Sequence, residues 1–112
     1  MRIKILSSAI DDLHAGRLFY ENNAEGVGAY FFDSLFSDID SLVLYAGIHQ
    51  IVYGYHRMLS KRFPYAIYYK VQDDIAIVRR VLDLRSKPSK IRHALVQGAN
   101  NRLGCEDRYG RS

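Results

Sequence analysis

Side chains that can bind phosphate are concentrated between residues 56 and 85. Arginine grips a phosphate through two parallel hydrogen bonds, and lysine and histidine add charge or exchange protons. Such a group could stabilise the extra negative charge of the transition state in RNA cleavage. A base would also have to remove the proton of the 2′-hydroxyl, and an acid would have to protonate the leaving oxygen. The cationic set consists of His56, Arg57, Lys61, Arg62, Lys70, Arg79, Arg80 and Arg85.

The same residues have other interpretations. A group of cations is also typical of a solvated charged face, or of a surface that binds an acidic protein. An arginine can instead be neutralised within its own strand, and Asp83 lies on the same predicted strand face as Arg79 and Arg85. His56 or a tyrosine could transfer protons, but the spacing of the residues singles out neither.

Metal and nucleotide sites have recognisable spacings, which this chain lacks. The four histidines, at positions 14, 49, 56 and 93, show no metal-ligand spacing. No phosphate loop, nucleophile elbow or Cys–His pair is visible, and the glycines at residues 26 and 28 predict a turn. We therefore expect neither a metal nor a cofactor.

Charge is distributed unevenly along the 112 residues. Residues 1–50 carry three basic and seven acidic side chains, a balance of −4, whereas residues 51–92 carry ten basic and three acidic ones, a balance of +7. Residues 93–112 add +1, which gives the net charge of +4. This asymmetry predicts a dipolar molecule with one cationic surface.

The composition is that of one globular domain, with 48% apolar and 25% charged residues. No apolar run reaches the roughly 18 residues of a membrane span, and acidic residues follow the N-terminus too soon for a signal peptide. The single cysteine, Cys105, cannot form an internal disulfide, which favours a reducing cytoplasm. Residues 98–112 are polar and are expected to form a flexible tail.

The N-terminal half predicts one strand and two helices. Alternating isoleucines indicate a strand at residues 2–6, and a helix follows at residues 9–22, started by a weak capping box of Ser8 and Asp11. After a glycine-containing break, a second, antiparallel helix runs until Gly47. Its core-facing stripe consists of Phe32, Leu35, Ile39, Leu42 and Ala46.

Three strands follow the two helices. Residues 50–60 predict a strand with a bend at Gly54, and residues 65–71 predict a second strand. An acidic turn at residues 72–74 leads to a third strand at residues 75–85, whose two faces are both apolar at one end. That pattern is typical of an inner strand that is covered on both sides.

A last helix begins near Ser86 and Pro88, has Ile91 and Leu95 on one stripe, and ends at Gly98. The predicted order is β-α-α-β-β-β-α, and the fold class is α+β. A helical hairpin packs on one face of a small, mostly antiparallel sheet, while the other face holds a basic cleft open. Residues 1–97 are expected to form this single domain.

Three stretches of the chain resemble one family of small proteins. They read GYHRMLSKRFPYAIYYKVQDDIAIVRRVLDLRSKPSKIR (residues 54–92), AIDDLHAGRLFYE (residues 9–21) and GVGAYFFDSLFSDIDSL (residues 26–42). Over about residues 2–96 the chain resembles the RelE/ParE superfamily of bacterial type II toxin–antitoxin toxins, which includes ParE-like plasmid stabilization proteins. Residues 61–88 are the specific part of this likeness.

The resemblance implies a small toxin that a cognate antitoxin wraps and neutralises. RelE-like members cleave messenger RNA on the ribosome, whereas ParE-like members inhibit DNA gyrase and are not nucleases. Arg85 matches the arginine that closes the last strand of the RelE-like enzymes. Ala66 occupies the position of their preceding-strand arginine, for which Arg62 could substitute in space, and the family's following tyrosine is missing from residues 86–92. These departures favour a ParE-like toxin.

The resemblance thus implies a toxin that is not an enzyme and that binds its target, with DNA gyrase as the expected target, through a basic surface. That surface consists of Arg57, Lys61, Arg62, Lys70, Arg80 and Arg85. The alternatives are a metal-independent, ribosome-dependent endoribonuclease and a non-toxic interaction protein that keeps the fold. The ribonuclease would use Arg85, Arg62, Lys61 and His56. A homodimer or a toxin–antitoxin hetero-oligomer is the expected assembly.

Overall fold

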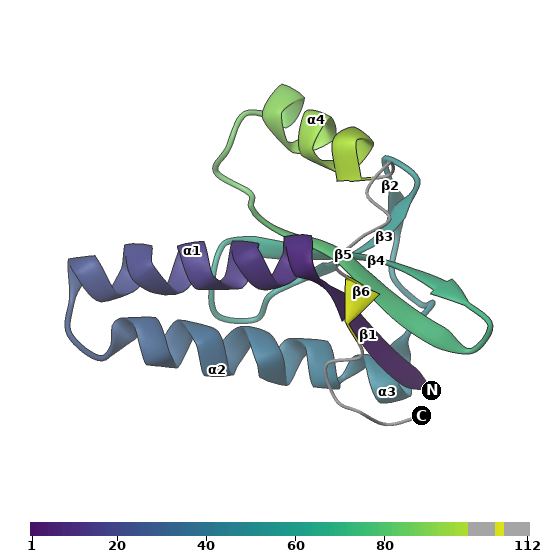
Figure 1. The fold of residues 1–112 in the computed structure, drawn as a ribbon, viewed down its shortest axis with the longest axis horizontal. Coiled ribbons are helices and arrows are strands. Elements are labelled where there is room, and N and C mark those ends of the chain that lie inside the picture. The colour runs from purple at the N-terminus through teal and green to yellow at the C-terminus, as the bar shows by residue number, and fades with distance from the viewer. Residues whose placement is uncertain (99–104, 107–112) are drawn as a thin grey trace.

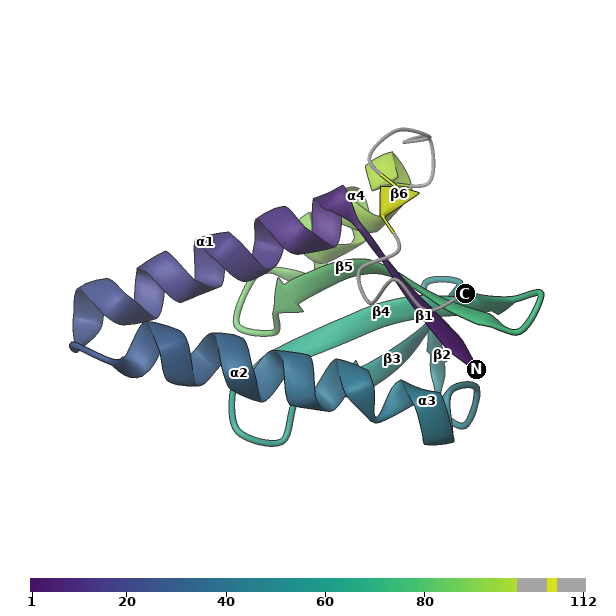
Figure 2. The same cartoon turned by 60° about the horizontal axis from the view of Figure 1, so that its bottom comes forward.

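The computed structural model describes residues 1–98 and 105–106. Its core is a six-stranded sheet with the order β2-β3-β4-β5-β1-β6. The first strand, β1 (Arg2–Leu6), runs parallel to the inner strand β5 (Ile75–Asp83), and the other neighbouring pairs are antiparallel. Figures 1 and 2 show the hairpin of α1 and α2 along one face of the sheet and α4 against the other face.

The predicted fold class is confirmed: an α+β fold in which a helical hairpin packs on a mostly antiparallel sheet and a short helix follows the last long strand. Three short elements, α3, β2 and β6, are additions to the predicted order. The remaining bounds are α1 (Ser7–Asn23), α2 (Val27–Asp40), α3 (Leu42–Tyr45), β2 (Ile51–Val52), β3 (Tyr55–Leu59), β4 (Tyr65–Gln72), α4 (Pro88–Gly98) and β6 (Cys105–Glu106).

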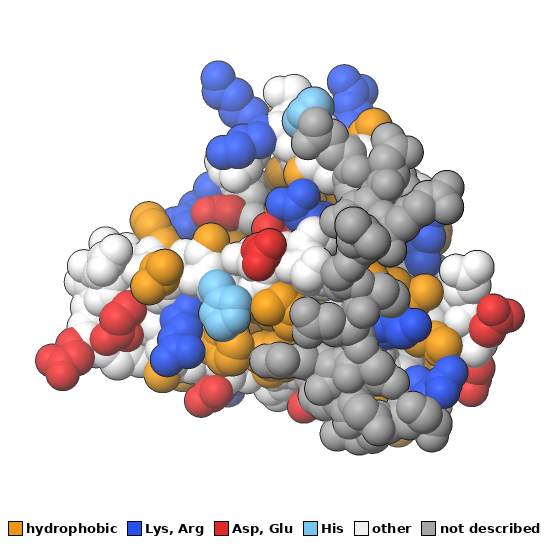
Figure 3. Space-filling view, viewed as in Figure 1, with side chains coloured by type: hydrophobic (Ala, Val, Ile, Leu, Met, Phe, Trp, Pro, Cys, Tyr) orange, Lys and Arg blue, Asp and Glu red, His pale blue; other side chains and the backbone are white. Residues whose placement is uncertain are grey.

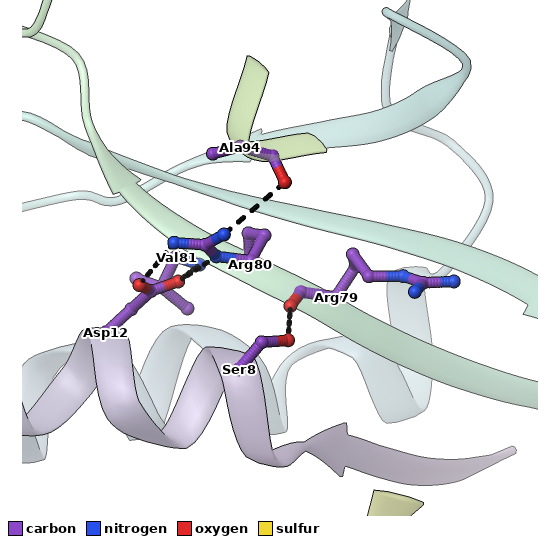
Figure 4. A network of polar contacts seen from close by, with 6 residues as sticks. All are labelled: Ser8, Asp12, Arg79, Arg80, Val81 and Ala94. Carbon is purple, nitrogen blue, oxygen red and sulfur yellow. Dashed lines mark hydrogen bonds and ion pairs between the residues drawn. The ribbon is translucent and has the colours of Figure 1, made fainter. Parts of the chain in front are cut away.

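The start of α1 differs from the prediction. The helix follows β1 directly, and no side chain caps its N-terminus, so the predicted capping box of Ser8 and Asp11 was wrong. The hydroxyl of Ser8 instead donates a hydrogen bond of 2.7 Å to the carbonyl oxygen of Arg79 (Figure 4). This bond ties the first turn of α1 to β5.

The second predicted helix is divided at Ser41, so that α2 ends at Asp40 and the four-residue α3 follows. The hydroxyl of Ser41 donates to the carbonyl oxygen of Asp38 at 2.6 Å, which satisfies one acceptor at this helix end. Phe31 is fully buried, whereas Phe32, predicted for the core, is only half-buried. The fully buried residues of this stripe are Phe31, Leu35, Ile39 and Leu42.

The predicted strand over residues 50–60 is a β-hairpin, because the chain reverses at Tyr53 and Gly54. Both residues have positive φ angles, 55° and 83°, which is the conformation of a two-residue hairpin turn. Asp73 and Asp74 make a similar reversal between β4 and β5, with φ angles of 52° and 62°. The predicted turn at residues 72–74 is therefore confirmed, while the bend at Gly54 is sharper than predicted.

Two cores hold the layers together. The larger core lies between the sheet and the α1–α2 hairpin and includes the isoleucines of β1. The smaller core lies on the other face, where Ile91 and Leu95 of α4 pack on the sheet against Tyr55, Ala66 and Tyr68. Because β5 contributes to both cores, the prediction of an inner strand covered on both faces is confirmed.

The predicted flexible tail lies mostly outside the described residues, which exclude residues 99–104 and 107–112. Within it, β6 pairs antiparallel with β1, an element that the sequence did not predict. Among the described helices, none has the length and apolar character that crossing a membrane would require.

Candidate target-binding surface

A cationic surface, formed by Lys4, Arg57, Lys70 and Arg80, lies on the sheet face that α4 partly covers. Side chains alternate along a strand, and the isoleucines that flank Lys4 lie in the hairpin-side core, so Lys4 is on the α4 side. Arg57, Tyr68 and Arg80 lie opposite one another on β3, β4 and β5. Burial raises the pKa of Tyr68, and the Arg57 guanidinium that hydrogen-bonds to its phenol opposes this rise.

A buried tyrosine organises the centre of this face. The Nζ of Lys70 lies 4.7 Å, and the Cζ of Arg79 lies 5.8 Å, from the centroid of the Tyr55 ring. Both cations are thus within reach of a favourable cation–π interaction. The pairing of β4 with β5 shifts between Tyr68 and Tyr69, which makes Arg79 the extra residue of a β-bulge. Figure 4 shows that the side chains of Arg79 and Arg80 point apart.

Arg80, one of the six predicted target-binding residues, is held in an ion pair. The carboxylate of Asp12 on α1 accepts hydrogen bonds from Nε and Nη2 of Arg80 at 2.7 and 2.9 Å, and from the backbone N–H of Val81 at 2.9 Å (Figure 4). The Nη1 of Arg80 donates to the carbonyl oxygen of Ala94 at 3.4 Å. Arg80 therefore fastens both α1 and α4 to β5.

The electrostatics of this ion pair agree with a structural role. Burial raises the pKa of Asp12, while the hydrogen bonds from Arg80 and from the Val81 N–H act against the rise. The hydrogen bond to Asp12 raises the pKa of Arg80. The two-pronged contact keeps the guanidinium engaged with its partner, so Arg80 contributes little free charge to the surface.

Arg85 lies just beyond β5 and is paired with Asp83, one of the two pairings that the sequence allowed. Its Nε and Nη2 bond the two carboxylate oxygens at 2.9 and 2.7 Å. These bonds lower the pKa of Asp83 and raise the pKa of Arg85. The same Nη2 donates to the Tyr20 hydroxyl at 3.3 Å, and Cζ lies 5.7 Å from the centroid of the Phe19 ring. The Arg85 side chain remains 52% exposed, so it is accessible but partly neutralised.

Lys61 and Arg62 are exposed on the loop between β3 and β4. This loop is anchored by Asp38, whose carboxylate accepts hydrogen bonds from the Ser60 hydroxyl at 2.8 Å and from the Lys61 N–H at 3.3 Å. Asp38 is buried, although the sequence placed it off the apolar stripe. Its role could not be predicted, because an aspartate on a helix is usually solvated and its partners are more than 20 residues away.

His56 lies on the opposite face of the sheet from the cations. Its Nδ1 donates to the carbonyl oxygen of His49 at 2.7 Å, and its ring stacks on Tyr69 with centroids 5.0 Å apart. The Tyr69 hydroxyl in turn contacts Nδ1 of His49. Burial, together with the nearby His56, lowers the pKa of His49. His56 is therefore part of a structural cluster with His49 and Tyr69 on the side of the sheet that carries the α1–α2 hairpin.

The four candidate catalytic residues do not form one site. The loop cations share one end of the sheet with Arg85, because the backbone N–H of Leu84 donates to the carbonyl oxygen of Pro64 at 2.8 Å. His56 is paired with Tyr69 further along β4 and faces the other way. A cation and a proton-transferring group thus do not converge on one phosphate position.

A pocket of about 320 Å³ lies between α1, β5 and the start of α4. It is bordered by both ion pairs, through Asp12, Arg80 and Asp83, and by the apolar side chain of Phe19. Tyr65 also lines it, and burial raises the pKa of this phenol to about 12. At neutral pH the pocket therefore offers paired charges, the ammonium group of Lys90 and a neutral hydroxyl, rather than a free base.

The distribution of charge over the surface agrees with the sequence pattern. Figure 3 shows Lys and Arg side chains around α4 at the top of the view, whereas acidic side chains lie along the helical hairpin and at the β4–β5 turn. Among the described residues, no group of three or more His, Cys, Asp or Glu side chains could hold a metal ion.

Comparison of the chain with models of known protein families and with curated proteins finds no match.

Proposed function

We propose that the protein is the toxin of a type II toxin–antitoxin system and that it acts as ParE-like toxins do, by binding a target rather than by cleaving RNA. One observation carries the proposal: Lys4, Arg57 and Lys70 share one face of the sheet and form no ion pair with a carboxylate of residues 1–98. Lys70 is exposed and Lys4 and Arg57 are half-buried, and cations that reach the surface of an ordered sheet suit an acidic partner surface. We propose DNA gyrase as the target and the cytoplasm as the location.

The residue pattern supports binding over catalysis. Cleavage of RNA requires a base within hydrogen-bonding distance of the 2′-hydroxyl and a cation at the phosphate. His56, the candidate base, faces the hairpin, and the guanidinium of Arg85 is already bound to Asp83. A ribonuclease site would therefore need Arg85 to leave its partner and a base to come from elsewhere.

The cognate antitoxin is proposed to be acidic, because the toxin carries a net charge of +4. Such an antitoxin would add an ordered segment beside the helices and the sheet, and its ordering would occur on binding. The antitoxin would neutralise the toxin if that segment covers the cations that bind the target.

The proposal is tested by inducing the chain in bacteria without an antitoxin and by assaying purified gyrase for supercoiling. We expect growth arrest, and inhibited supercoiling at micromolar protein. Arrest with unaffected gyrase would remove gyrase as the target, and harmless expression would support the non-toxic interaction protein instead. Translation-dependent cuts in messenger RNA that Arg85→Ala abolishes would support the ribonuclease.

A further inference from the structure

One segment of the chain lacks the four charged residue types. Between Asp40 and Arg57 there is no Asp, Glu, Lys or Arg, although these types make up 25% of the chain. The segment forms α3, the following loop and β2. Five of its large apolar side chains are between 43% and 78% exposed: Val43, Leu44, Tyr45, Ile48 and Ile51. These five residues are called the α3–β2 patch below.

The patch lies on the side of the sheet that carries the helical hairpin. Ile51 of β2 is opposite His56 of β3, and residues opposite one another in an antiparallel pair point to the same face. Met58, two residues beyond His56, belongs to the hairpin-side core. Ile51 therefore points to the side on which α3 lies.

The backbone under the patch is held in place. The N–H of Ile48 donates to the carbonyl oxygen of Tyr45 at 3.3 Å, and the N–H of Gly47 donates to the buried Tyr69 hydroxyl at 2.9 Å. His49 contacts the same hydroxyl. The apolar side chains are thus presented on an anchored loop, which lowers the entropic cost of burying them in a contact.

The patch has the size of a functional surface. Five side chains at these exposures leave on the order of 500 Å² of surface, which is comparable with the largest apolar patch of a typical monomer, and such a patch is often functional. A standard interface buries about 800 Å² on each partner. The patch would supply more than half of such an interface, with polar rim residues supplying the rest.

We propose that the α3–β2 patch is the contact between two copies of this chain, related by a two-fold axis. In such a contact the same surface meets itself, so any charge in it would face a like charge. The molecule carries a net charge of +4, but the five residues of the patch are uncharged, so two copies of the patch can meet without like charges facing each other. This inference does not rest on the proposed toxin function.

Two features favour a second copy over an acidic partner. The cations that would recognise acidic groups lie on the α4 side of the sheet, whereas the patch offers no charge to complement them. In addition, β2 is the first strand in the sheet order, so within residues 1–98 and 105–106 no strand pairs with its outer edge. Two copies of β2 can approach antiparallel across a two-fold axis and add backbone hydrogen bonds to the apolar contact.

Sedimentation velocity of the full chain, from about 1 µM to about 200 µM, tests the proposal. We expect a monomer at the low end of this range and a dimer at the high end. The dimer should persist in 1 M salt, since the contact is apolar rather than ionic. A monomer throughout the range would overturn the proposal.

Substitutions place the contact on the molecule. Leu44→Glu and Ile48→Glu, each at a site more than 70% exposed, should raise the dimer dissociation constant at least tenfold. Leu18→Glu makes the same change at a 64% exposed site on α1, outside the patch, and should leave the dimer intact. Circular dichroism checks that each variant is folded, and Ile48→Gln replaces any variant that is not. A dimer that the patch variants leave unchanged, or that Leu18→Glu weakens equally, would rule out this interface.

Discussion

Asp12 on α1 and Arg80 on β5 form an ion pair whose side chains are only 14% and 22% exposed. The pair lies where α1, β5 and α4 meet, because Arg80 also donates to the carbonyl oxygen of Ala94. A charge that is mostly removed from water is stable only while its partner is present. The packing of both helices on β5 therefore depends on this contact.

Replacement of Asp12 by Asn should lower the free energy of unfolding by about 2–4 kcal/mol, because Arg80 would then be left largely buried without a countercharge. Urea unfolding followed by circular dichroism measures the loss. Asp11→Asn is the matched control, since Asp11 is exposed and adjacent in the sequence. Equal losses in the two variants would show that the ion pair does not stabilise the fold.

Gly28→Ala should destabilise the helical hairpin by about 1–3 kcal/mol. A methyl group at this position would lie 2.6 Å from the carbonyl oxygen of Arg17 and 2.8 Å from Cβ of Glu21, so α1 and α2 would have to separate. Ala29→Ser, at the exposed next position, should change the unfolding free energy by less than about 0.5 kcal/mol. A thermal or urea melt of Gly28→Ala that matches wild type would contradict the close approach.

Acid should destabilise the protein through His49. Its pKa is lowered from the usual 6.5, so the unfolded chain binds this proton more readily than the folded one. The contribution of neutral His49 to stability is therefore complete above about pH 6.5, and it is lost as the pH falls from there through the pKa of His49 in the folded protein. The unfolding free energy, measured at several pH values between about 5 and 8, should follow this curve.

His49→Asn separates this effect from other titrations. The amide oxygen of Asn can accept the hydrogen bond from Tyr69 but does not titrate, so the pH dependence between about 5 and 7 should become shallower. His93→Asn, at an exposed site on α4, should leave the slope unchanged. An unaltered slope in His49→Asn would exclude His49 as its source.

Reversal of one exposed charge should distinguish the target-binding face from the rest of the surface. Lys70→Glu removes the cation that lies over the Tyr55 ring, and should weaken target inhibition and growth arrest at least tenfold. Arg17→Glu makes the same change in net charge on the exposed side of α1 and should act like wild type. If both variants lose activity equally, net charge rather than this face governs the effect.

The Arg85→Ala variant should fold normally, and any change in its toxicity should not result from a loss of RNA cleavage. Its ion pair with Asp83 is largely exposed, so the unfolding free energy should change by less than about 1 kcal/mol. Primer extension on messenger RNA from induced cells should show no translation-dependent cuts in either wild type or the variant. Cuts that are present in wild type and absent in Arg85→Ala would replace the proposed binding mechanism with catalysis.

Periodicity made much of the fold predictable. The long strands β4 and β5, with the acidic turn between them, follow from alternation and from a pair of turn-forming aspartates. The hairpin at Tyr53 and Gly54 was missed because a single glycine signals a bend as readily as a reversal. That reversal shortened β3, but the residues facing each core still follow the period of two.

The ion pairs were the less predictable part of the candidate surface. Asp12 and Arg80 are 68 positions apart, and neither residue carries a local signal that it meets the other. Asp83 and Arg85 are two positions apart, and the sequence predicted one strand face for both, so their pairing could be foreseen as one of the alternatives. The cations of residues 56–85 could be recognised from composition, but the positions of Arg79 and Arg80 on β5 depend on a bulge at Arg79 that the sequence did not predict.

The parallel pairing of β1 with β5 has a consequence for the order in which the protein folds. Arg2 is paired with Ile75, so the first strand to leave the ribosome has no neighbour until at least about two thirds of the chain has been synthesised. Until then, β1 has no partner strand, and only β2, β3 and β4 are present to cover the apolar side of the helical hairpin. A ribosome stalled before β5 emerges should therefore hold a nascent chain that chaperones bind, and release of β5 should end that dependence.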